Sequence, residues 1–404
     1  MSVITLFSGN FCNEEAFLSE VQEKTACRLI KEQEILSRAA SLSGMPENKL
    51  QGAFSAKPSI FNSFTHEKER AIAHLRMALS EFLVEDKLLV QGFAGHLIPK
   101  TISHVMSVCL ISDVKHRMSA ASDKYSEKEA LGLIKKHDED YAAWIKLLYE
   151  RKDPWNTGLY DIVIPTDKMS PGEAGSLIKE NMSGIVLQPT SRSKKAVEDF
   201  QLAASVEASL AREGHNVSVD ARDGVAILTI NKHVLMLSRL EDELKTLAEK
   251  VPGVKSAVTV IGKNFHKTDI YRKFDFDVPS KVLLVDDERE FVQTLSERLM
   301  MRDMGSAVAY DGESAIDMVN EHAPEVMILD LNMPGIDGIE VLRRVKQTSP
   351  EIEVIILTGH GSEDDRKTCM GLGAFDYLHK PVDIDVLSKT LQAANDKIHT
   401  RKES

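Results

Sequence analysis

Five side chains that could do chemistry come at or just after the ends of four short apolar runs. They are three carboxylates, one hydroxyl and one ammonium: Asp286, Asp287, Asp330, Thr358 and Lys380. The runs that precede them are residues 282–285, 326–329, 354–357 and 375–378. Because the carboxyl ends of parallel strands meet at one edge of a sheet, we expect these five side chains to lie together.

These residue types indicate metal-assisted phosphoryl transfer to a carboxylate. Three carboxylates at close range repel one another, and they stay ionised only when a cation joins them. Hard oxygen ligands that leave room for water favour Mg²⁺. A carboxylate beside Mg²⁺, here Asp330, can attack a phosphoryl group while Lys380 supplies a second positive contact. Thr358 can then donate a hydrogen bond to the phosphoryl oxygen on the modified Asp330.

The segment that carries these residues is predicted to fold as a doubly wound parallel sheet. From Lys281 to about Ile398, apolar runs alternate with stretches of helical periodicity. In such sheets ligands bind beyond the carboxyl ends of the strands, where the strand order reverses. The predicted fold therefore supplies the common edge that the chemistry needs.

The same segment resembles the response-regulator receiver domain of two-component signalling. The resemblance is carried by four stretches: Val285–Glu288, Asp330–Gly338, Thr358–Gly361 and Ala374–Pro381. It implies a flavodoxin-like fold of five parallel strands and five helices over residues 280–400, and a phosphohistidine donor for Asp330. The implied partner is a sensor histidine kinase or a phosphotransfer protein, and such domains often form homodimers. A receiver-shaped domain that is never phosphorylated stays open as the alternative.

The resemblance also implies a set of ligands and contacts. Mg²⁺ would be the cofactor, and its protein ligands would be Asp286, Asp287, Asp330 and the Asn332 carbonyl. Lys380 would bridge to the phosphate, and Thr358 would swing towards it. Tyr377 would then move inward behind Thr358. Phosphorylation would add negative charge and acceptor oxygens at Asp330. These would favour one of two arrangements of the neighbouring loop.

Length and composition limit the other functions. The chain has 404 residues, which predicts two to four domains. Its formal net charge of -12 argues against nucleic-acid binding and attraction to anionic membranes. No apolar run approaches the roughly 20 residues that span a bilayer, and the N-terminus has no export signal. The four cysteines are far apart, so we expect reduced thiols in a cytoplasmic protein.

Residues 1–188 are predicted to form an α/β layered domain. Short strands are expected at Val3–Leu6, Lys87–Gln91 and Val105–Ile111, among helices at Glu14–Ala40 and His66–Leu83. The segment resembles the cytidylate-kinase-like family, which implies a P-loop-kinase-like fold. This resemblance is carried by residues 88–96, 108–117 and 155–164.

The phosphate contacts of such a kinase are incomplete in this sequence. The loop after the first strand has only Gly9 and no lysine, and Glu14 and Glu15 at the helix start would repel phosphate. Where the family places an arginine, the run 135–141 is acidic, which leaves Arg117 as the remaining candidate beside Gly9. We expect a degenerate kinase domain that binds a nucleotide or another small ligand, or serves as an output surface.

Residues 194–262 are predicted to form a small α+β unit after a polar linker at Pro189–Lys195. The expected order is helix, strand, strand, helix, strand, with a hairpin turn at Asp223–Gly224. This order, together with Val251–Ser256, resembles a BON domain, a family often tied to lipid or ligand contact. A packing or dimerisation module stays open as the alternative. A second linking segment, called the seam, at residues 262–280, leads to the receiver-like segment.

Three interpretations of the whole chain follow. The leading one is a two-component response regulator that acts through its upstream domains or a partner, not by DNA binding, because no helix-turn-helix pattern follows the receiver-like segment. The rival is a nucleotide kinase regulated by an attached receiver. The third is a scaffold that senses a ligand through the middle unit. A nucleotide-binding titration would separate the first two.

Overall fold

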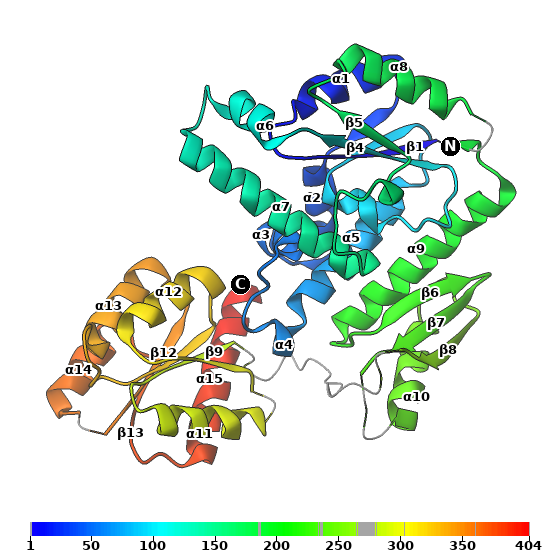
Figure 1. Ribbon diagram of the computed structural model, residues 1–404. Helices are drawn as coiled ribbons and strands as arrows, with labels where there is room; N and C mark the ends of the chain where they lie inside the picture. Colours follow the sequence, from blue (N-terminus) through cyan, green and yellow to red (C-terminus); the bar gives the residue numbers. More distant parts are fainter. Residues whose placement is uncertain are drawn as a thin grey trace. The chain divides into compact units, whose positions relative to one another are not determined.

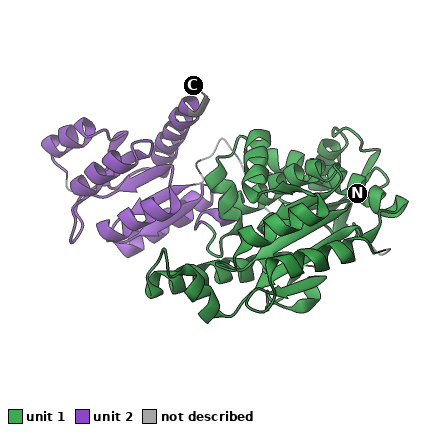
Figure 2. Ribbon diagram, turned by 90° about the horizontal axis from the view of Figure 1, so that it is seen from above, with its two compact units in different colours: residues 1–58, 67–271 green, residues 59–66, 272–404 purple. Residues whose placement is uncertain are grey.

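The computed structural model describes residues 2–403 apart from 185–186, 233, 235–236, 264, 266–278, 280, 303 and 360. Its backbone divides into two compact units, residues 1–58 with 67–271 and residues 59–66 with 272–404 (Figure 2). Most of the predicted seam at residues 262–280 lies outside the described residues. No described helix combines the length and the apolar character that crossing a membrane requires.

The first sheet of unit 1 is fully parallel, with the strand order β2-β3-β1-β4-β5 (Figure 1). Its strands are β1 Val3–Ser8, β2 Arg28–Ile30, β3 Leu88–Gln91, β4 Val105–Ile111 and β5 Ile162–Pro165. On one face, Ile4 and Leu6 pack against α1 (Glu14–Thr25) and α8 (Pro171–Met182). On the other face, Val3 packs against α2 (Glu32–Ser43) and α5 (Glu67–Phe82). The predicted α/β layered domain is therefore observed.

Shorter helices and α7 (Glu127–Tyr149) complete this part of unit 1. The short ones are α3 Glu47–Gln51, η1 Gly52–Phe54, η2 Phe93–Leu97, α6 Val114–Ala121 and η3 Thr157–Leu159. The single helix predicted at Glu14–Ala40 is wrong. Helix α1 ends where Ala26 adopts a left-handed φ of 55°, and Arg28–Ile30 then pairs with β3 as an edge strand. Sheet pairing has overridden the helical periodicity of the sequence.

Helix α9 (Ser191–Arg212) belongs to two cores at once. Val197 and Phe200 near its start lie in the core of the first sheet. Val206 and Leu210 lie in the core of a small sheet formed by residues 218–222, 225–230 and 256–261, which is called the third sheet. The polar linker predicted at Pro189–Lys195 is wrong from residue 191 onwards, because Thr190 caps the helix by accepting a hydrogen bond from the Ser193 amide at 3.0 Å. The shared helix explains why both sheets form one compact unit.

The third sheet is small and mixed. It contains β6 Ser218–Arg222, β7 Val225–Ile230 and β8 Ser256–Ile261, with β6 antiparallel and β8 parallel to β7. Helices α9 and α10 (Leu237–Ala248) cover one face, which completes the predicted order of helix, strand, strand, helix, strand. The hairpin predicted at Asp223–Gly224 is confirmed, since both residues have the positive φ that such a turn requires.

Unit 2 contains the second five-stranded parallel sheet, ordered β10-β9-β11-β12-β13 (Figure 1, yellow to red). The strands are β9 Val282–Val285, β10 Ser306–Ala309, β11 Val326–Leu329, β12 Glu353–Thr358 and β13 Asp376–His379. The helices are α11 Arg289–Met300, α12 Gly312–His322, α13 Gly338–Thr348, α14 Glu363–Gly371 and α15 Ile384–Glu403; the short α4 (Asn62–Thr65) is grouped with this unit.

Alternate residues along the strands of this sheet pack against the helical layers on its two faces. Leu283 and Val285 pack towards α12, α13 and α14, whereas Val282 and Leu284 pack towards α11 and α15. Strands buried on both faces read as continuous apolar runs, as the sequence indicated. The predicted doubly wound, flavodoxin-like fold is observed.

Candidate functional site

The strand order of unit 2 reverses between β9 and β11, and two acids follow these neighbouring strands. The register pairs Val285 with Leu329, the last residues of the two strands. The Asp330 amide donates to the Val285 carbonyl at 2.9 Å, and the Asp286 amide donates to the Ala309 carbonyl at 3.2 Å. Backbone pairing therefore delivers both carboxylates to the same point of the sheet edge, where open α/β sheets bind ligands.

Three carboxylates meet at this point. One oxygen from each of Asp286, Asp287 and Asp330 lies within 4.8 Å of the others. Asp286 and Asp330 are only 4% and 5% exposed, whereas Asp287 is open to solvent. Burial raises the pKa of Asp286, although the hydrogen bond from Lys380 acts in the opposite direction. The cluster therefore has the spacing and the hard oxygen donors that suit Mg²⁺.

Lys380 is the cation of the cluster. Its Nζ lies 2.6 Å from Asp286, 3.1 Å from Glu288 and 3.3 Å from Asp330. Burial disfavours the charged ammonium, but the hydrogen bonds to Asp286 and Glu288 raise the pKa of Lys380 overall. The Nζ also lies 4.6 Å from the centroid of the Phe291 ring. Sequence reasoning assigned no role to Glu288, although it directly follows the acidic pair.

Thr358 and Tyr377 lie close to the cluster through strand pairing. Thr358 ends β12 and is fully buried, and its carbonyl accepts a hydrogen bond from the Lys380 amide at 2.9 Å. Tyr377 lies on the neighbouring strand and is 6% exposed. Its buried hydroxyl has no hydrogen-bond partner among the described residues. Tyr377 thus already occupies an inward position in this structure. Asn332 is exposed on the loop after β11.

A cavity of about 1100 Å³ opens at the carboxyl ends of β1 and β3 in unit 1. Gly9 and the first turn of α1 line it. The loop that the sequence suggested as an incomplete phosphate-binding loop therefore lies at a cavity. Glu14 begins α1 and accepts a hydrogen bond from Gln91 Nε2 at 2.7 Å. Burial raises the pKa of Glu14 and brings the pKa of Glu32, another lining residue, to about 7.

Three of the five N–H donors of the Arg117 guanidinium bind neighbouring groups. Its Nη1 and Nη2 donate to the two carboxylate oxygens of Asp138 at 2.9 and 2.8 Å, and its Nε donates to the Asn10 carbonyl at 2.8 Å. Arg117 is 3% exposed, and a Cβ added at Gly9 would lie 3.5 Å from its Cζ. The structure therefore brings Gly9 and Arg117 together, and the acidic run supplies the partner that occupies the arginine.

Family comparisons match two parts of the chain. Residues 282–392 match the response regulator receiver domain, and residues 3–168 match the cytidylate kinase-like family. Each match covers less than half of the chain. The C-terminal segment is thus a receiver domain with an acidic pocket, and the N-terminal segment is cytidylate-kinase-like. Neither match covers the third sheet, so its BON resemblance gains no support.

Similar proteins share the receiver segment. The transcriptional regulatory protein CpxR of Escherichia coli K12 is 44% identical over 102 residues, which are 25% of this chain and 43% of that protein. The response regulator MprA of Mycobacterium sp. strain KMS is 32% identical over 116 residues, or 29% and 50% of the two chains. The chain thus spans half or less of the length of these relatives. A receiver domain structure from Clostridium thermocellum is 32% identical and covers 30% of this chain and 96% of that one, with a TM-score of 0.29.

Proposed function

We propose that the chain is a two-component response regulator whose receiver domain accepts a phosphoryl group on Asp330. The donor is a phosphohistidine on a sensor histidine kinase or a phosphotransfer protein, and the reaction takes place in the cytoplasm. Output runs through the upstream domains or through a partner rather than through DNA. The observation that carries the proposal is the convergence of three carboxylates and Lys380 at one sheet edge.

The charge of the cluster supports a divalent cation. Four carboxylates, those of Asp286, Asp287, Glu288 and Asp330, surround one ammonium, so three negative charges are left in excess. Asp286, Asp287, Asp330 and the Asn332 carbonyl would hold Mg²⁺, which when bound offsets negative charge on the phosphoryl oxygens. A structure with these acids splayed apart in magnesium would contradict this assignment.

Transfer needs one nucleophile and a set of fixed charges. An Asp330 carboxylate oxygen attacks the phosphorus, the bond from phosphorus to the donor imidazole breaks, and the imidazole nitrogen keeps the electron pair. Lys380 is close enough to shift from Asp330 to a phosphoryl oxygen. Thr358 donates its hydroxyl hydrogen bond to the same group, and Tyr377 fills the space behind Thr358.

Labelling with a small phosphoryl donor tests the proposal. Incubation of the full chain with acetyl phosphate and Mg²⁺ should add one phosphoryl group, because the metal offsets the repulsion between donor and acceptor. The product is an acyl phosphate, so hydroxylamine should remove it. Intact-mass spectrometry with and without Mg²⁺ measures both steps. A label that survives hydroxylamine, or no label at all, would contradict the proposal.

Removal of the Lys380 charge should shift metal binding and labelling in opposite directions. In Lys380→Met, Mg²⁺ should bind about tenfold more tightly, because a unit charge about 6 Å from a divalent ion is worth roughly 1.4 kcal/mol even at the dielectric constant of water. Labelling should slow, because a phosphoryl contact is lost. Mg²⁺ titration calorimetry and acetyl phosphate labelling measure the two effects. The exposed Lys389→Met on α15 is the matched control, and weaker metal binding in Lys380→Met would be inconsistent with the arrangement.

For the upstream segments we propose binding rather than catalysis. The first sheet carries a kinase-like fold without kinase activity, since Arg117 is occupied by Asp138 and Glu14 lies at the start of α1. The cavity beside Gly9 and the family match favour the rival, a receiver-regulated nucleotide kinase. CMP-dependent consumption of ATP by the full chain would decide for that rival. The BON-like interpretation of residues 194–262 remains a proposal that rests on its element order.

A further inference from the structure

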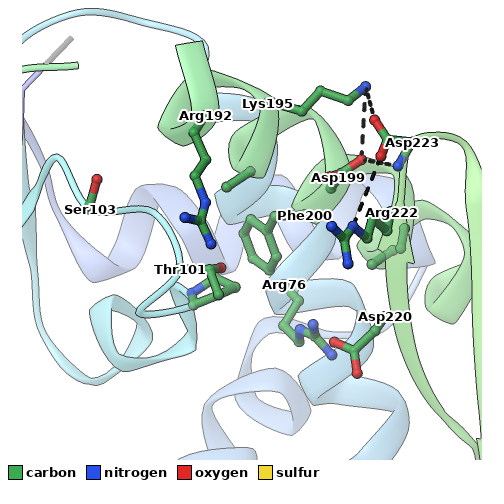
Figure 3. A pocket seen from close by; sticks show the side chains of 14 residues that line it. Arg76, Thr101, Ser103, Arg192, Lys195, Asp199, Phe200, Asp220, Arg222 and Asp223 are labelled. Atoms are coloured by element: carbon green, nitrogen blue, oxygen red, sulfur yellow. Dashed lines mark hydrogen bonds and ion pairs between the residues drawn. The ribbon is translucent and has the colours of Figure 1, made fainter. Parts of the chain in front are cut away.

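A cavity of about 680 Å³ lies in unit 1 and shares no lining residue with the cavity beside Gly9 (Figure 3). Four segments that are distant in sequence line it, one of them being α5, which contributes Arg76; the other three form its walls. These are the loop at residues 99–103, the first half of α9, and the end of β6 with the hairpin that follows. The cavity therefore lies where the kinase-like part of unit 1 meets the third sheet.

Four cations line this cavity, although the chain as a whole carries a net charge of -12. They are Arg76, Arg192, Lys195 and Arg222. Arg192, in the first turn of α9, points its guanidinium into the cavity and makes no hydrogen bond or ion pair with any described residue (Figure 3). Arg222 is exposed, and its Nε is 3.9 Å from Asp223. The guanidinium of Arg192 is therefore available to a ligand, and the exposed guanidinium of Arg222 can join it by giving up a long ion pair with Asp223.

The acids of the cavity are largely committed to one another and to Lys195. The Lys195 Nζ lies 4.0 Å from Asp199 and 3.7 Å from Asp223, and the Asp223 amide donates to the Asp199 carboxylate at 2.9 Å. Asp220 lies beside Arg76, whose guanidinium forms an ion pair with Glu207. This pairing leaves Arg192 as the cation of the cavity that has no partner among the described residues, whereas Arg222 has one long ion pair, 3.9 Å to Asp223.

The remaining lining suits an organic phosphate. The hydroxyl-bearing Thr101 and Ser103 lie on the wall opposite the hairpin, and Phe200 forms the floor between the arginines (Figure 3). The start of the 22-residue helix α9 adds a favourable field for an anion. Guanidinium groups match phosphate oxygens in geometry and charge, and a volume in the range of ordinary ligand pockets leaves room for an attached organic group.

We infer that this cavity binds a phosphorylated small molecule, with its phosphate held between Arg192 and Arg222 and its organic part over Phe200. Bound phosphate would connect α9 to the β6–β7 hairpin across the cavity. Binding would thus hold the third sheet against the kinase-like part, because a ligand stabilises the state that it binds. The inference is independent of phosphorylation at Asp330 and gives the middle segment a sensory role.

Calorimetry on the full chain tests this inference. The probes are glucose 6-phosphate, inorganic phosphate and glucose, in buffer with EDTA so that the acidic cluster in unit 2 holds no metal. Glucose 6-phosphate and phosphate should bind, and glucose should not. Arg192→Gln and Arg222→Gln should each weaken glucose 6-phosphate binding by at least about tenfold, because each removes a charge-assisted hydrogen bond.

Arg239→Gln is the matched control, since it removes the same charge from an exposed site on α10 of the same unit. It should leave the affinity unchanged. Both pocket substitutions are at exposed positions, so folding should be preserved. The inference is overturned if neither phosphate probe binds the unmodified chain, or if Arg239→Gln weakens binding as much as the pocket variants do.

Discussion

Replacement of Asp330 by asparagine is expected to reduce labelling by acetyl phosphate to the background level. The side-chain amide cannot act as the attacking oxygen, and the cluster also loses one of the charges that hold a divalent ion. The fold should survive, because Lys380 keeps its closer partner Asp286 at 2.6 Å and the Asp330 backbone amide still bonds to Val285. Intact-mass spectrometry after incubation with Mg²⁺ measures the loss.

Asp337→Asn serves as the matched control for this experiment. Asp337 caps α13 by accepting a hydrogen bond from the Glu340 amide at 2.8 Å, and asparagine is an equally good cap. This variant should therefore label like the unmodified chain. Full labelling of Asp330→Asn would place the acceptor elsewhere and remove the basis of the proposed function.

Arg117→Ala is expected to lower the free energy of unfolding of unit 1 by about 2 to 4 kcal/mol. The substitution removes three hydrogen bonds of a residue that is 3% exposed, and it leaves the half-buried Asp138 carboxylate without its cation. Although burial works in the opposite direction, the nearby His137, with its Nδ1 3.8 Å from the carboxylate, and the hydrogen bonds from Arg117 keep the pKa of Asp138 below its usual range. Loss of this arginine should therefore raise the pKa of Asp138.

Urea unfolding followed by tryptophan fluorescence measures this effect selectively. The chain has only two tryptophans, Trp144 and Trp155, and both belong to the kinase-like part of unit 1. Asp138→Asn should cost less than Arg117→Ala, and the double variant should cost less than the sum because the two residues share one interaction. The exposed Arg239→Ala should change stability by no more than about 0.5 kcal/mol. If Arg117→Ala were as stable as that control, the contacts of Arg117 would not stabilise the fold. The arginine of the unmodified chain could then bind a phosphate instead.

The fold and the functional residues of the receiver domain could be predicted from the sequence because the patterns that indicate them are local. Each functional side chain comes at or just after the end of an apolar strand, so the strand pattern and the residue type together state both position and chemistry. Parallel pairing then brings Asp286 and Asp330 together without further information. Similarly, Asp223–Gly224 specifies its own hairpin, because few residues adopt positive φ in succession.

The sequence alone therefore determined the doubly wound fold of unit 2, the α/β layered character of the first sheet, the acidic cluster and its partner Lys380. Tertiary structure decided the features that depend on contacts between distant residues. It paired Arg117 with Asp138, made Arg28–Ile30 a strand instead of part of a helix, and carried α9 through two cores. Periodicity and residue type report a local environment, whereas an ion pair or an edge strand depends on which surface the folded chain brings alongside.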